Sequence, residues 1–84
     1  MANMTEAVVS MSGAMPLSLA HGGSVVRVES VHGNEEMHRH LESLGFVSGT
    51  EVEVVSQASG TVIVSVKGAR MGLNERTARH VYVR

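Results

Sequence analysis

The 84-residue sequence contains no cysteine, no aspartate and no tryptophan, and only one tyrosine, one phenylalanine and one proline. Without cysteine the chain has no disulfide, no thiolate nucleophile and no cysteine-ligated zinc or iron–sulfur cluster. Without aspartate it has no EF-hand loop and no Ser-His-Asp triad. Two aromatic side chains are too few to stack on nucleic-acid bases. A formal net charge of -1 provides no positive potential that would attract a phosphate backbone. Nucleic-acid binding is therefore not expected.

Long apolar runs are also missing, since none exceeds three residues. A membrane-spanning helix needs about 20 predominantly apolar residues, so no direct membrane insertion is expected. The first residues have neither the positive start nor the long apolar stretch of a signal peptide. The expectation is a cytoplasmic protein.

The length allows one domain, and 43% apolar residues are typical of a globular one. Residues 1–14 hold three of the six methionines and a single charge, with no clear pattern. We expect a flexible N-terminal tail over residues 1–14. The ordered domain is expected over residues 15–84.

Valines alternate with polar residues in several short segments, which is typical of half-buried strands. A helix is predicted at about Asn34–Leu44, because Asn34 is a favourable N-cap and Gly45 suits a left-handed C-terminal position. A shorter helix is predicted at about Asn74–Arg79. The predicted fold is mainly β, a small antiparallel barrel of five or six strands whose closure hides the sheet edges. The longer helix is expected after the first strand and the shorter one before the last. The predicted core is Val26, Val28, Leu41, Leu44, Val52, Val54, Val62, Val64, Leu73, Ala78, Val81 and Val83.

Histidine is the only residue type here that could carry metal or acid–base chemistry. His38 and His40 are two apart on the predicted helix and point away from each other, whereas His38 and Glu42 are four apart. We expect no metal site and no cofactor, with His38, Glu42 and His80 as weak surface candidates. No P-loop, dinucleotide-binding glycine motif or nucleophile elbow is present, so an enzyme is not expected.

Two surfaces are candidates for binding another protein. The polar face of the first helix offers Glu36, Arg39, His40 and Ser43. The segment before the second helix offers Arg70 and Met71, a charge and a soft apolar group of the kind enriched at interfaces. Copies of this protein could also use one of these surfaces to form a weak homo-oligomer.

Three segments resemble the FeoA family of small ferrous iron transport proteins. Leu41 to Val54, LESLGFVSGTEVEV, is similar to the family's "RLxELGLxPGTxVEV" segment. Lys67 to Val83 resembles the family's ending, and Met15 to Gly33 resembles its beginning. The resemblance implies an SH3-like barrel and no enzyme activity.

The resemblance also implies a function. It suggests a cytoplasmic accessory protein of ferrous iron uptake, an adaptor that binds the cytosolic GTP-binding domain, or an adjacent region, of a FeoB-type transporter. The alternative is a metal-ion-binding carrier or sensor, related to the C-terminal domain of iron-dependent repressors. Scattered histidines favour the adaptor, because ferrous iron prefers clustered imidazole and carboxylate ligands.

Overall fold

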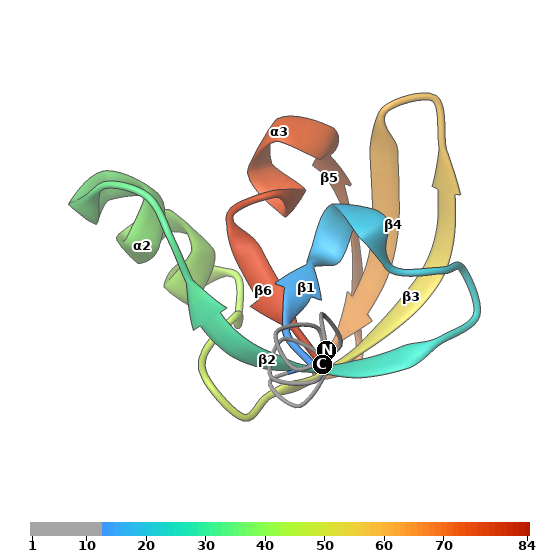
Figure 1. The fold of residues 1–84 in the computed structure, drawn as a ribbon, viewed down its shortest axis with the longest axis horizontal. Coiled ribbons are helices and arrows are strands. Elements are labelled where there is room, and N and C mark those ends of the chain that lie inside the picture. Colours follow the sequence, from blue (N-terminus) through green and yellow to red (C-terminus); the bar gives the residue numbers. More distant parts are fainter. Residues whose placement is uncertain (1–12) are drawn as a thin grey trace, which may run out of the picture.

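The computed structural model describes residues 13–84, a twisted sheet curled into a small barrel (Figure 1). The predicted tail, residues 1–14, lies outside the described residues except for its last two positions. The described part confirms a mainly β fold with a short helix before the last strand, and the longer helix follows the second strand because a two-residue strand precedes the one expected to be first. Its elements are β1 (Met15–Pro16), η1 (Leu17–Leu19, a 3₁₀ turn), β2 (Val25–Val31), α2 (Glu35–Ser43), β3 (Glu51–Ala58), β4 (Thr61–Val66), β5 (Ala69–Asn74), α3 (Glu75–Ala78) and β6 (Val81–Val83).

The strands pair antiparallel in the order β1-β6-β2-β3-β4-β5. Two-residue turns join β3 to β4 and β4 to β5, and all four turn residues have positive φ. Such turns match the right-handed twist of the strands that they connect. Lys67, with a φ of 52°, belongs to the second turn, because β4 ends before it at Val66.

The hydrogen-bonded ladder has two ends, β1 and β5, that are not paired with each other. Closure of the barrel was expected to hide the sheet edges. However, β1 is only two residues long and β5 is six, so β1 is too short to cover the far edge of β5. The edge of β5 stays without a strand partner within residues 13–84.

The core lies between the inward faces of the strands, and valine fills most of it. Val52 and Val54 are fully buried while Glu51 and Glu53 are exposed, which confirms the predicted register of β3. Eleven of the twelve predicted core residues are buried, and Leu44 is the exception. The sequence prediction missed four further buried residues, which are Leu17, Ala20, Phe46 and Val66.

Both ends of α2 are capped by the residues that the sequence indicated. The side chain of Asn34 accepts a hydrogen bond from the Met37 amide at 2.8 Å. At the other end Gly45 has a φ of 103°, and the Phe46 amide donates to the Leu41 carbonyl at 3.0 Å. This is a Schellman ending, which turns Phe46 into the core. Leu44 is the C-cap residue and only half-buried, so its predicted burial is wrong.

The short helix α3 is stabilised in a similar way at its start. The Thr77 amide donates to the side chain of Asn74 at 2.8 Å. Leu73 before this cap and Ala78 in the first turn are both buried. This pair brackets the helix start and fixes its entry angle, as a hydrophobic staple does.

Candidate partner-binding surface

The four polar residues predicted on the first helix lie together on one exposed face of α2. Glu36 lies three and four residues before Arg39 and His40, and Ser43 lies four and three residues after them, which places the four side chains on one face. Figure 1 shows α2 to one side of the barrel, away from the β3–β4 hairpin. This face, which we call the α2 face, is therefore open to a second molecule.

The side chains of the α2 face are only lightly engaged within the chain. Arg39 lies 3.7 Å from Glu35, but both side chains are largely exposed, so this ion pair restrains Arg39 little. The Ser43 hydroxyl donates to the His40 carbonyl at 2.6 Å. The Arg39 guanidinium and the His40 imidazole are thus exposed and little restrained within the chain.

A shallow hollow of about 310 Å³ lies beside the α2 face, lined by Asn34, Glu36, Met37 and His40. Met37 is half-buried and packs against the core, so it forms the apolar part of the hollow. Glu36 and His40 supply its polar rim.

The second predicted surface is divided by the sheet. Arg70 is exposed on the outer face of β5, directly opposite Ser65 of β4. Met71 points to the other face, opposite Val64, and packs half-buried against the core. Successive strand residues point to opposite faces, so these two side chains do not form one patch. A partner contact at Arg70 and Met71 stays a prediction.

The structure does not bring the weak metal candidates together. His38 and Glu42 lie on α2, both exposed, and His80 lies half-buried just before β6. Within residues 13–84, no group of three or more histidine, cysteine or acidic side chains is arranged to hold a metal ion.

The sequence did not reveal that His32 and His80 are neighbours. The His32 amide donates to the His80 carbonyl at 2.7 Å, beyond the end of the β2–β6 pairing. The His32 ring packs against Tyr82 with 4.4 Å between ring centroids, and it shares a hydrogen bond with Ser30. Only the register of two strands that are distant in sequence could have indicated this cluster.

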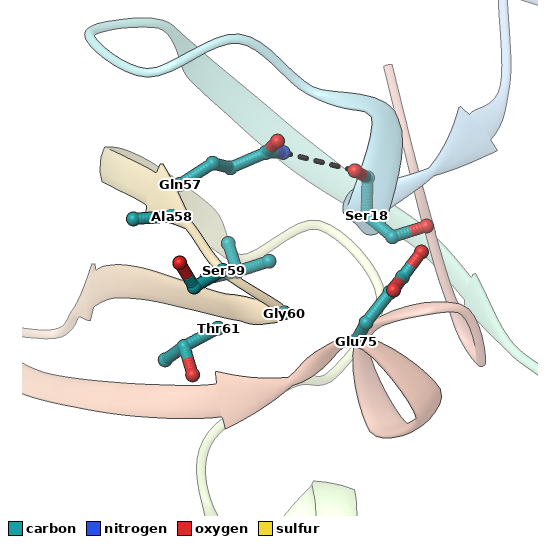
Figure 2. A pocket seen from close by; sticks show the side chains of 8 residues that line it. Ser18, Gln57, Ala58, Ser59, Gly60, Thr61 and Glu75 are labelled. Atoms are coloured by element: carbon teal, nitrogen blue, oxygen red, sulfur yellow. Dashed lines mark hydrogen bonds between the residues drawn. The ribbon is translucent and has the colours of Figure 1, made fainter.

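A polar notch of about 220 Å³ lies between η1, the β3–β4 turn and the start of α3 (Figure 2). The Gln57 side chain crosses to η1, where it donates to the carbonyls of Ser18, at 2.9 Å, and Ala20. Glu75, also in the lining, forms an ion pair with Arg79 at 3.6 Å. The lining thus offers hydroxyls, one amide and one carboxylate that is paired with Arg79.

The part of the chain that the structure describes contains no helix long and apolar enough to cross a membrane. The arrangement consists of an SH3-like barrel with an exposed, capped helix. A family model described as the FeoA domain matches residues 15–84. The chain belongs to the FeoA family. It is thus a non-enzymatic accessory protein of ferrous iron transport.

Solved structures agree with this assignment. A crystal structure of an iron uptake regulatory protein (FeoA) is 30% identical, with a TM-score of 0.79, over 84% of this chain and 95% of that one. FeoA from Stenotrophomonas maltophilia, described as complexed with zinc and as an SH3 domain protein, is 34% identical with a TM-score of 0.74. The match covers 83% of this chain and 89% of that protein.

A manganese-dependent transcriptional repressor shares the fold with a TM-score of 0.76. It is 20% identical over 83% of this chain but only 40% of the repressor, so the likeness concerns the fold alone. No curated protein matches the chain.

Proposed function

We propose that this protein is a cytoplasmic adaptor that binds the cytosolic part of a FeoB-type ferrous iron transporter. The family assignment supports the transport system, and the α2 face supports the docking mode. The observation that carries the proposal is a helix, capped at both ends, that presents Arg39 and His40 to solvent.

The caps matter because they keep α2 folded without a partner. The Asn34 side chain accepts a hydrogen bond from a backbone amide of the first turn. At the last turn the chain reverses direction at Gly45, so that backbone amides donate to helix carbonyls that would otherwise lack a partner. A nine-residue helix has little stability by itself in water, so capping and the buried Leu41 hold its shape. A preformed surface loses less conformational entropy on binding, which favours recognition through α2.

The alternative is a metal carrier or sensor, since manganese-dependent repressors share this fold. The histidine and glutamate candidates on α2 and before β6 are spread over separate places, and this arrangement supports the adaptor over the carrier. A ferrous iron titration under anaerobic conditions separates the two. Binding tighter than about 100 μM would favour the carrier or sensor.

The direct test measures binding to the purified cytosolic domain of the transporter by biolayer interferometry. Arg39→Glu reverses the charge at the centre of the α2 face and should weaken binding about tenfold or more. Arg76→Glu makes the same charge change on α3 and should leave binding within about twofold, since α3 lies outside the proposed contact.

The fold of each variant is checked by circular dichroism before binding is measured. If the wild-type protein does not bind the cytosolic domain, the adaptor proposal is wrong. If Arg39→Glu and Arg76→Glu bind equally well, the α2 face is not the docking surface.

A further inference from the structure

Among residues 13–84, β5 is an edge strand with few of the features that usually protect such an edge. It pairs with β4 at all six positions without a bulge and contains no proline. Besides β4, it packs chiefly against α3, which follows directly at its C-terminal end. Ala69, Arg70 and Gly72 are exposed. A regular edge of this length is a template for pairing with another strand.

The turn between β4 and β5 determines which backbone groups face outward. In a two-residue hairpin the flanking residues, here Val66 and Ala69, form a hydrogen-bonded pair. Hydrogen-bonded and non-hydrogen-bonded pairs then alternate along the ladder. Met71 and Leu73 therefore point their amides and carbonyls toward β4. Arg70 and Gly72 point theirs toward the free edge.

We infer that β5 binds β5 of a second copy of this chain, antiparallel and centred on Met71. In this register Arg70 lies opposite Gly72 of the second copy, and Gly72 lies opposite Arg70 of that copy. Both pairs consist of residues whose amides and carbonyls face outward, so the two strands exchange four hydrogen bonds. The result is a symmetric dimer with one sheet continuing across both copies.

The side chains in this register are complementary. Gly72 has no side chain on the outer face, and a Cβ there would lie 3.3 Å from Cδ1 of Ile63. The aliphatic stem of Arg70 from the second copy can cover Gly72 and extend over the half-buried Ile63. On the inner side the two half-buried Met71 side chains meet at the symmetry axis, where each removes apolar surface of the other from water.

Other symmetric registers fit less well. Centring on Arg70 would place two guanidinium groups directly opposite each other, which is unfavourable. Centring on Gly72 would pair Arg70 with Asn74, whose side chain caps α3 where the chain leaves the sheet. The register centred on Met71 avoids both problems.

The first test is sedimentation velocity on the isolated protein over a range of concentrations, so its result does not depend on the transporter. The expected result for the wild-type chain is a reversible dimer that gains population with concentration. Arg70→Pro removes an amide that points away from β4, and should weaken dimerisation about tenfold or more, because each dimer loses two hydrogen bonds. Arg70→Ala keeps that amide and should have a smaller effect.

The second test introduces a single cysteine into a chain that has none. In the proposed register two Met71→Cys residues form a non-hydrogen-bonded pair with Cα atoms about 4.5 Å apart, a separation that allows a disulfide. Leu19→Cys is the matched control, because Leu19 is an exposed apolar residue on η1. Under mild oxidation by glutathione, Met71→Cys should form a covalent dimer much faster than Leu19→Cys.

A wild-type protein that stays monomeric at every concentration overturns the inference. Equal cross-linking rates for the two cysteine variants, or equal dimerisation of Arg70→Pro and Arg70→Ala, also overturn it. If Arg70→Pro fails to fold, the cross-linking rates of Met71→Cys and Leu19→Cys still test the proposed dimer.

Discussion

Replacing Gly45 with alanine tests how α2 is joined to the barrel. Gly45 has a φ of 103°, a conformation in which a Cβ is strained. The added Cβ would also lie 3.1 Å from Cγ1 of Val66, a buried core residue that has little room to move. The backbone strain costs about 1–2 kcal/mol and the crowding about 1 kcal/mol more, so the free energy of unfolding should fall by about 2–3 kcal/mol.

A matched control separates these two effects. Gly49 has a φ of 91°, and a Cβ there would meet no atom within 4 Å. Gly49→Ala should therefore show the backbone strain alone, about 1–2 kcal/mol. The difference between the two variants measures the contact with Val66.

The assay is thermal and urea unfolding followed by far-ultraviolet circular dichroism. In a domain of this size, 1 kcal/mol shifts Tm by about 4–8 °C, so Gly45→Ala should melt about 8–24 °C below wild type. If Gly45→Ala melts at the wild-type temperature, the Schellman ending contributes no stability and the reasoning fails. If Gly45→Ala and Gly49→Ala have the same Tm, the contact of the added Cβ with Val66 does not lower the free energy of unfolding.

Four further substitutions test the capping, the core and the link to η1. Asn34→Ala removes the cap on the Met37 amide and should lower the free energy of unfolding by about 1 kcal/mol in urea titrations. Leu41→Ala should cost about 2–5 kcal/mol, whereas Leu44→Ala should cost about 1–2 kcal/mol, because only Leu41 is fully buried. Equal costs would contradict the assignment of Leu44 as a half-buried C-cap. Gln57→Ala removes the hydrogen bonds to the η1 segment and should cost about 1 kcal/mol, with faster amide exchange in η1; unchanged exchange would show that these bonds do not hold it.

The candidate site was predicted only in part. The sequence placed Glu36, Arg39, His40 and Ser43 on one face of a helix, and the structure has them there. This succeeded because helical spacing is a local property. No local pattern reports which surfaces of two distant elements lie together, and so the His32–His80 contact was not foreseen.

The sequence by itself determined the local features of this protein. Alternating valines set the buried faces of β2, β3, β4 and β6, and the glycine and asparagine positions set the turns and the helix ends. These features depend on residues a few positions apart, whose conformational preferences and burial act over that short range.

Only the tertiary structure decided how these elements close on each other. It turned Leu17–Leu19 into a 3₁₀ turn that buries Leu17 and leaves Leu19 65% exposed. It buried Phe46 in the core and left Leu44 only half-buried. It also left β5 at an edge of the ladder with no strand partner within residues 13–84. The physical reason is that strand order and core packing depend on contacts between residues far apart in sequence, and no repeating pattern along one chain records them.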